Sequence, residues 1–264
     1  MRFRKMHGAG NDFVLLTDPA PARDWAPTAR SLCARRTGIG ADGLVLVTQT
    51  DTTPPVFEVA CFNTDGSTST MCGNALRCAA WCLHADHGLR DMTLIMAGVK
   101  HGAVVDADGV RVTAEVGAVE MRRVQAVIDG RPLWFDAART GTEHVVAVVR
   151  DVDAIDAETC GRLVRHHDQL APLGTNVNFV QAAGDQTLKI RTYERGVEAE
   201  TLSCGSGAVA AVVIAAARGL VGQSQVTVHN ASGTPLTVRP HWDRPGRAYW
   251  VGGPVALVFE GATA

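Results

Sequence analysis

The sequence of 264 residues shows no excess of charge of either sign, because 25 basic and 27 acidic residues give a net charge of −2. No basic stripe runs along it, which argues against a nucleic-acid partner or an anionic membrane surface. No segment reaches the roughly 20 consecutive apolar residues that a membrane-spanning helix needs. We therefore expect neither nucleic acid nor a membrane as a partner.

Features of exported proteins are also missing. Residues 1–13 carry positive charge but no apolar core of signal-peptide length. The seven cysteines are odd in number and form no regular disulfide framework, which is typical of a reducing compartment. These absences predict a cytoplasmic location. An apolar content of 46% supports a real core in one large or two ordinary domains.

One stretch stands out, Tyr193–Ala217, which reads YERGVEAETLSCGSGAVAAVVIAAA. Its second half, Ala208–Ala217, is apolar throughout and rich in alanine, which favours a helix that is buried on all sides. Cys204 precedes this helix. The free N–H groups and the dipole at a helix start favour an anion and lower the pKa of a thiol there.

A similar motif occurs half a chain length away. Residues 71–81 read MCGNALRCAAW, so that Cys72-Gly73-Asn74-Ala75 matches Cys204-Gly205-Ser206-Gly207 in kind. Each motif has a cysteine, a glycine, a small polar residue and a small residue before a helical segment. The repetition predicts two similar domains, each with a thiol at the start of a helix.

The remaining pattern consists of short apolar segments between glycine- and aspartate-rich turns, without regular alternation of strand and helix. Further helices are expected at Trp25–Arg36, from Cys72 to about His84, and at Asp153–Arg165. Expected strands include residues 13–16, 44–48, 56–63, 144–149, 176–181, 187–194 and 255–259. The pattern predicts an α+β fold of two mostly antiparallel sheets, each wrapped around a helix, with a boundary near Gly117.

The segment Gly38–Gly43 fits the dinucleotide-binding pattern G-x-G-x-x-G. That fingerprint requires a strand before it and a helix after it. Here a helical segment precedes and a strand follows, so we reject a dinucleotide site.

Two thiols can invert an amino-acid α-carbon. A thiolate on one face removes the weakly acidic α-proton, and a thiol on the other face returns one. The backbone N–H groups at the two helix starts can hold the substrate carboxylate and stabilise the charge that builds on it. Pyridoxal phosphate is not required for this scheme, and the sequence indicates no cofactor.

Together with its flanks, the cysteine pair resembles the diaminopimelate epimerase family, cofactor-independent amino-acid epimerases of lysine and peptidoglycan precursor synthesis. The resemblance rests on HGAGNDF (7–13), TGIGADG (37–43), FNTDGSTSTMCGNALRC (62–78), LGTNVNFV (173–180) and YERGVEAETLSCGSG (193–207). It implies two pseudo-symmetric α+β domains with the active site in the cleft between them. The domains are residues 1–117, completed by a strand at about 253–264, and residues 118–252. A homodimer is common in the family.

The resemblance also implies roles for individual residues. Cys72 and Cys204 are the catalytic pair, Glu194 receives the reacting α-ammonium, and Arg195 receives a remote carboxylate. The implied substrate-binding set is Asn11, Asn63, Gly73, Asn74, His144, Asn176, Glu194, Arg195, Gly205 and Ser206. Taken alone, the asparagines are more typical of turns or strand ends, Glu194-Arg195 of a surface ion pair, and His144 of a structural histidine.

The chain departs from the family at one point, because Thr142-Glu143 stands where Asn-Pro is common before the histidine. A two-thiol racemase for another amino acid therefore remains an alternative. A metal or redox module built from Cys72, Cys78, Cys82, His84 and His87 is a weaker one, because its spacing is not that of zinc-binding C-x₂₋₄-C pairs. A non-catalytic binding protein would not need both thiols. The other cysteines, Cys33, Cys61, Cys78, Cys82 and Cys160, are expected in the core.

Overall fold

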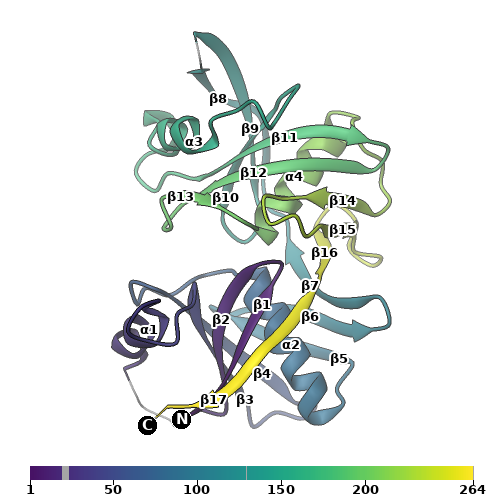
Figure 1. Ribbon diagram of the computed structural model, residues 1–264. Coiled ribbons are helices and arrows are strands. Elements are labelled where there is room, and N and C mark those ends of the chain that lie inside the picture. Colours follow the sequence, from purple (N-terminus) through teal and green to yellow (C-terminus); the bar gives the residue numbers. More distant parts are fainter. Residues whose placement is uncertain (20–23, 129, 264) are drawn as a thin grey trace. The chain divides into compact units, whose positions relative to one another are not determined.

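The computed structural model describes residues 1–19, 24–128 and 130–263. Backbone contacts divide the chain into two compact units, Met1–Thr113 with Gly252–Ala264, and Ala114–Val251. Each unit has a curved sheet with helices packed against it (Figure 1). Within the described ranges, no helix has the combined length and apolar character that crossing a membrane demands.

The first unit orders its strands β17-β1-β2-β3-β4-β5-β6-β7. Two pairs are parallel, β2 with β3 and β4 with β5, and the other pairs are antiparallel. The chain crosses between the parallel partners through α1 (Trp25–Cys33) and α2 (Gly73–His87). The strands are β1 (Arg2–Gly8), β2 (Asn11–Thr17), β3 (Gly43–Gln49), β4 (Val56–Asn63), β5 (Asp91–Met96), β6 (Val99–Asp106), β7 (Gly109–Glu115) and β17 (Val255–Ala262).

The second unit orders its strands β8-β9-β10-β11-β12-β14-β15, and β13 pairs with β12 alongside β14. Its crossover helices are α3 (Ala157–Arg165) and α4 (Gly205–Ala217), with a short 3₁₀ turn, η1 (Asp168–Leu170), after α3. The strands are β8 (Val119–Ile128), β9 (Arg131–Arg139), β10 (Glu143–Val148), β11 (Asn176–Gly184), β12 (Thr187–Glu194), β13 (Ala199–Thr201), β14 (Val226–His229), β15 (Leu236–Pro240) and β16 (Ala248–Gly253).

The two units repeat one topology. In the first, β2 is parallel to β3, β3 antiparallel to β4, and β4 parallel to β5. In the second, β10, β11, β12 and β14 follow the same sequence of parallel, antiparallel and parallel pairs. The predicted pseudo-symmetric α+β architecture is therefore confirmed. The parallel crossovers were not evident from the strand pattern alone.

Each sheet is apolar on both faces. Successive side chains of a strand point to opposite faces, and both sets include buried apolar residues. In the first unit Val14 and Leu44 pack in the cluster that includes α1, whereas Phe13 and Val45 pack in the cluster that includes α2. In the second unit the α3 side receives Val145, Val177 and Phe179. The opposite side of that sheet packs on α4, which contacts β9, β10 and β11.

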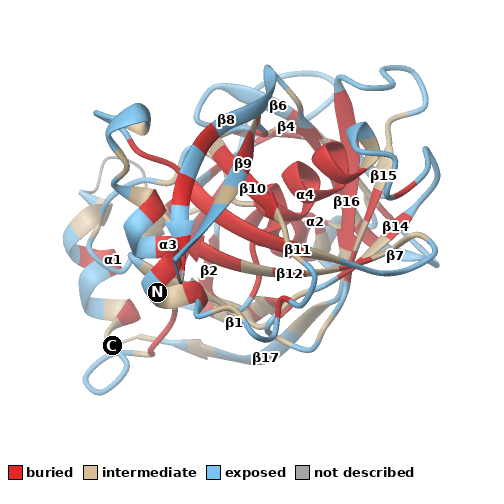
Figure 2. Ribbon diagram, turned by 90° about the horizontal axis from the view of Figure 1, so that it is seen from above, coloured by how far each residue is buried: buried red, intermediate tan, exposed pale blue. Residues whose placement is uncertain are grey.

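The helix predicted to be buried all round is α4. It is buried from Gly205 to Ala215, and only its last turn reaches the surface. Figure 2 shows α2 and α4 largely in the colour of buried residues. An apolar helix of this kind is stable because the surrounding sheet removes its whole circumference from water.

The helix ends differ from expectation for local reasons. α1 stops at Cys33 because the chain turns back, and the N–H groups of Ile39 and Gly40 donate to the carbonyl of Leu32. α3 begins at Ala157 because Asp156 caps it, accepting from the N–H of Thr159 at 3.0 Å. α2 continues to His87, where Gly88 adopts the left-handed conformation that ends many helices.

The packing of α3 on β12 leads to a prediction. A Cβ atom at Gly161 would lie 2.3 Å from the Cβ atom of Tyr193, whose side chain is buried. We expect Gly161→Ala to lower the free energy of unfolding by about 1–3 kcal/mol through overpacking, despite the better helix propensity of alanine. Urea unfolding followed by circular dichroism measures this. Leu163→Ala, at an exposed position of the same helix, is the control; an equal or larger loss there would contradict the packing argument.

Candidate active site

Cys72 occupies the N-cap position of α2. Its backbone is extended, with φ −140° and ψ 98°, and its side chain makes no capping hydrogen bond. Its own N–H donates to the Sδ atom of Met96 at 3.2 Å. The first N–H groups of a helix have no intrahelical partner, so Gly73 and Asn74 begin a turn suited to an anion. The thiol is half-buried at this position.

A second thiol lies beside Cys72. Cys61 on β4 is buried on the sheet face that packs against α2. Its hydrogen bond with Cys72 and its burial raise the pKa of the Cys61 thiol well above the ordinary value. Cys61 therefore keeps its proton and can donate it to the sulfur of Cys72. Cys61 lies in the core, as the sequence predicts, but its contact with Cys72 was not expected.

Asn11 and Asn74, two expected binding residues, are joined directly. The Nδ2 atom of Asn74 donates to the Oδ1 atom of Asn11 at 3.1 Å, and the Nδ2 atom of Asn11 donates to the Oδ2 atom of Asp42 at 2.9 Å. Asp42 is tied in turn to Arg35, at 2.7 Å, and to the N–H of Asp12. The start of β2 is thereby fixed against the first turn of α2.

Asn63, at the end of β4, is occupied in a local turn. Its Nδ2 atom donates to the Oγ atom of Ser67 at 2.9 Å, and its N–H donates to the carbonyl of Ser67. The side chain is half-buried. The structure thus places Asn63 in the unit that carries Cys72, as the last residue of β4 before the loop that leads to Cys72.

Cys204 occupies the N-cap position of α4 with a backbone similar to that of Cys72, φ −120° and ψ 108°. Its Sγ atom accepts from the N–H of Gly207 at 3.4 Å and lies 3.5 Å from the Oγ atom of Ser206. The residue is 8% exposed. Hydrogen bonds donated to sulfur favour its charged form, so both contacts suit a thiolate.

A buried polar network fixes the proton arrangement behind Ser206. The Nδ2 atom of Asn178 donates to the carbonyl of Val145 at 3.0 Å and to the Nδ1 atom of His144 at 3.1 Å, while its Oδ1 atom accepts from Thr192. Nδ1 of His144 is therefore an acceptor, and the ring proton lies on Nε2. Nε2 then donates to the Oγ atom of Ser206 at 3.0 Å. This leaves the hydroxyl proton of Ser206 for the sulfur of Cys204.

His144 stays neutral in this environment. Burial and the positive charge of Arg195 lower its pKa from 6.5 to about 3. A neutral ring with a fixed tautomer donates through one nitrogen only. The histidine therefore acts as a hydrogen-bond donor to Ser206 and carries no charge of its own near neutral pH.

The Glu194-Arg195 pair lies at the end of β12, near the start of β10. The side chain of Asn176 links the two strands. Its Nδ2 atom donates to the carbonyl of Glu143 at 2.9 Å, and its Oδ1 atom accepts from the N–H of Arg195 at 2.9 Å. Glu194 accepts from Thr201 at 2.8 Å. The Nη2 atom of Arg195 donates to the Oγ1 atom of Thr142 at 2.8 Å. The residue that departs from the family pattern is thus a direct partner of this arginine.

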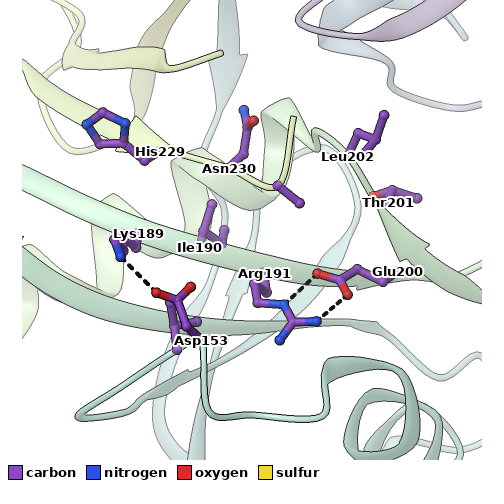
Figure 3. Close-up of a pocket in the computed structure, with 11 residues that line it drawn as sticks. Asp153, Lys189, Ile190, Arg191, Glu200, Thr201, Leu202, His229 and Asn230 are labelled. Carbon is purple, nitrogen blue, oxygen red and sulfur yellow. Dashed lines mark hydrogen bonds and ion pairs between the residues drawn. The ribbon is translucent and has the colours of Figure 1, made fainter. Parts of the chain in front are cut away.

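A separate pocket of about 450 Å³ lies on the second unit, and Figure 3 shows the side chains that line it. Its charged groups are paired with one another: Lys189 with Asp153 at 2.8 Å and Arg191 with Glu200 at 2.6 Å. Neither Cys204 nor His144 lines it. With its charges neutralised internally, this pocket offers no group suited to the two-thiol chemistry.

Two of the cysteines considered for a metal site are packed in the core of the first unit. Cys78 and Cys82 are buried on α2, and burial raises the pKa of the Cys82 thiol to about 11. Across the described residues, no group of three or more histidine, cysteine, aspartate or glutamate side chains has an arrangement that could hold a metal ion.

Within each unit several of the expected residues come together. Cys72, Gly73, Asn74 and Asn11 share one helix start, and Cys204, Gly205, Ser206 and His144 share the other. Asn178, Thr192 and Cys61 were not expected at these positions from the sequence. Asn178 follows Asn176 by two residues on one strand, so it shares a sheet face with it, and that spacing was an available signal.

Solved structures show which fold this is. A phenazine biosynthesis protein of the PhzF family from Bacillus anthracis matches with a TM-score of 0.75, 11% identity and coverage of 99% of this chain and 98% of that one. A hydroxyproline epimerase from Agrobacterium vitis, solved with bound trans-4-hydroxy-L-proline, matches with a TM-score of 0.70, 17% identity and coverage of 99% and 90%. The fold is therefore one that epimerases and PhzF-type proteins share.

Sequence relatives identify the family within that fold. The profile of diaminopimelate epimerase matches residues 3–121 and 137–254. The diaminopimelate epimerase of Aquifex aeolicus (strain VF5) is 36% identical over 275 residues, which cover 99% of this chain and 97% of the relative. That of Chlorobaculum tepidum is 37% identical over 265 residues, covering 97% and 98%. The chain belongs to the diaminopimelate epimerase family.

The neutral state of His144 predicts a pH dependence of stability. In the unfolded chain the imidazole takes up a proton below pH 6.5, whereas the folded protein resists it down to about pH 3. Stability is therefore full above pH 6.5 and is lost as the pH falls toward 3, by about 1.4 kcal/mol per pH unit.

Urea unfolding between pH 7 and pH 5 tests this against His144→Gln, which cannot titrate. We expect the wild-type free energy of unfolding to fall more steeply than that of the variant. Parallel curves for the two proteins would show that His144 is not held neutral by the fold.

Proposed function

We propose that this protein interconverts L,L- and meso-diaminopimelate by transferring an α-proton between the thiols of Cys72 and Cys204. The activity is that of an isomerase, as in the family to which the chain belongs. The observation that carries the proposal is the placement of a cysteine at the N-cap of each of two topologically equivalent buried helices, α2 and α4.

The chemistry needs one base and one acid on opposite faces of the α-carbon. A thiolate removes the α-proton and becomes a thiol, leaving a carbanion. The other thiol donates its proton to the opposite face and becomes a thiolate. Backbone N–H groups of Gly73, Asn74, Gly205 and Ser206 receive the α-carboxylate and stabilise the negative charge that spreads onto it. The chain's own groups supply every proton in this scheme.

The two half-sites support thiolates differently. At Cys204 the supporting donors are the N–H of Gly207 and the hydroxyl of Ser206, which His144 orients. At Cys72 the neighbouring Cys61 stays protonated and can donate a hydrogen bond to the Cys72 sulfur. Either cysteine can therefore be charged while its partner is neutral, as a reversible two-base reaction requires.

The polar groups around the thiols fit a substrate with two amino-acid ends. Glu194 is suited to the reacting α-ammonium, and Arg195 to the remote carboxylate. Asn11 and Asn63 are assigned to substrate on the first unit. The side-chain amide of Asn176 is hydrogen-bonded to the backbone of Glu143 and Arg195, so its contribution is to hold Arg195 in place.

Thr142 bears on the choice of substrate. A threonine hydroxyl is shorter than the asparagine amide common in the family, but it still contacts Arg195 at 2.8 Å. We infer that Arg195 remains oriented for a carboxylate. A two-thiol racemase acting on another amino acid is the alternative that the experiments below separate.

The deciding measurement is proton NMR of L,L-diaminopimelate with the protein in D₂O under reducing conditions. We expect loss of the α-proton signal and appearance of the meso isomer. Cys72→Ala and Cys204→Ala should each lower epimerisation by at least about a thousandfold, because each removes one of the two proton-transfer groups. Cys160→Ala, a buried cysteine on α3, is the matched control and should retain activity.

Two outcomes would redirect the proposal. Exchange that survives in both cysteine variants would exclude the two-thiol mechanism. The absence of exchange with reduced wild-type protein would favour the racemase for another amino acid, which the same exchange assay can find among other amino acids.

The role of Thr142 gives a second prediction. Thr142→Val keeps the shape of the side chain and removes the oxygen that orients Arg195. We expect KM for diaminopimelate to rise about five- to twentyfold, a loss of roughly 1–2 kcal/mol, with kcat little changed. Thr142→Asn should restore low KM. A Thr142→Val enzyme with unchanged KM would show that this contact does not serve the substrate.

A further inference from the structure

Arg77 lies on α2 and is 0% exposed. Its Nη2 atom donates to the Oδ1 atom of Asn74 at 2.6 Å, and its Nη1 atom to the carbonyl of Gly73 at 3.4 Å. Its Nε atom is buried without a hydrogen-bond partner. The guanidinium thus turns back toward the first turn of its own helix, as long helical side chains do.

The charge of Arg77 is not balanced by an acid. Among the described residues, no carboxylate forms an ion pair with it, whereas Arg218 of the second unit pairs with the buried Asp136 at 2.6 Å. Burial lowers the pKa of Arg77, while the nearby thiols of Cys78 and Cys72 act in the opposite direction. An arginine stays protonated even so, and a buried unpaired charge is costly. The free-energy cost of this unpaired charge suggests that an anion lies near Arg77 when the protein is active.

The other ionisable groups packed around α2 do not supply that anion at neutral pH. The pKa values of Cys61, Cys78 and Cys82 are raised, chiefly by burial for the last two, so all three stay neutral.

The carboxylates of Asp86 and Glu260 already have a partner, because both are paired with Arg4 of β1. His101, on the β6 face shared with Ala103, is hydrogen-bonded through Nδ1 to the carbonyl of Thr113.

Arg77 also orients two amides. Because a guanidinium only donates, it fixes Asn74 with Oδ1 inward. The Nδ2 atom of Asn74 then donates to Asn11, whose Nδ2 atom donates to Asp42. One buried cation therefore sets the direction of a hydrogen-bond chain through two residues assigned to substrate binding.

The equivalent position in the second unit is apolar. Arg77 follows Cys72 by five residues, and five residues after Cys204 stands Val209, which is fully buried. The polar support of Cys204 comes instead from the sheet, through His144, Asn178 and Thr192. The cation is thus a feature of the Cys72 half-site and not of the repeated scaffold.

We propose that Arg77 is a positioning residue for the Cys72 half-site, where its buried positive charge favours the thiolate of Cys72 and the binding of a carboxylate at the start of α2. The inference rests on the proposed function for its biological meaning. Its physical content, a thiolate stabilised by Arg77, is independent of which substrate the protein uses.

The test measures the thiolate directly. The rate of alkylation of Cys72 by iodoacetamide is followed against pH in a Cys204→Ala background, with the site mapped by mass spectrometry. The same is done after adding Arg77→Met, Arg77→Lys or the control Leu76→Met, a buried neighbour on α2. We expect Arg77→Met to slow alkylation at pH 7 about tenfold and to move the profile to higher pH, with the same plateau rate.

Arg77→Lys should recover most of the neutral-pH rate, because it keeps the charge, and Leu76→Met should match the parent. A purely structural role predicts something else: lower thermal stability in Arg77→Met with an unshifted alkylation profile. On our proposal the methionine variant keeps its Tm, since an unpaired buried charge is removed. If the methionine variant does not fold, Arg77→Gln gives the same comparison.

An alkylation profile of Arg77→Met or Arg77→Gln that coincides with the parent would overturn the proposal. This result is separable from failure of the proposed function. Wild-type protein that does not exchange diaminopimelate protons would refute the substrate assignment while leaving the effect of Arg77 on Cys72 measurable.

Discussion

The constraint on which the structure depends is the burial of the first turns of one helix by one curved sheet in each unit. In the second unit the buried helix is also apolar, as α4 is from Gly207 to Ala215. Its first turn is the only part whose polar groups have no intrahelical partner. A cysteine at the N-cap therefore lies where the positive potential of the helix is concentrated.

The same scaffold holds two chemically different environments. The register places Val45 opposite Cys61 in the first unit and Asn178 opposite Thr192 in the second. Phe13 at the start of β2 corresponds to His144 at the start of β10, since each pairs with the first residue of the following parallel strand. Cys204 is thus supported by a neutral hydrogen-bond network from the sheet. Cys72 is supported by the thiol of Cys61 on β4 and by the cation of Arg77 on its own helix.

Much of this was accessible from sequence, for identifiable reasons. The repeated Cys-Gly motif predicted both N-cap thiols, and the apolar run after Cys204 predicted a buried helix, because both signals are local. The crossover pairing of β2 with β3 was missed because strand partners are set by non-local contacts. Asn178 and Arg77 were missed because their importance comes from burial. Both are ordinary polar residues in the sequence, although Arg77 is the one charge between Met71 and His84.

The asymmetry between the half-sites bears on the proton transfer that we propose. If both thiols had identical surroundings, neither of them would be the preferred thiolate in the free protein. A cation beneath one helix start and a neutral donor network beneath the other make the two thiolates unequal in the free protein. On the proposed mechanism, a substrate carboxylate at the helix N–H groups reduces the advantage of the cation by partly neutralising it. Substrate binding therefore brings the two proton positions closer in energy, the condition under which a two-base exchange is fast both ways.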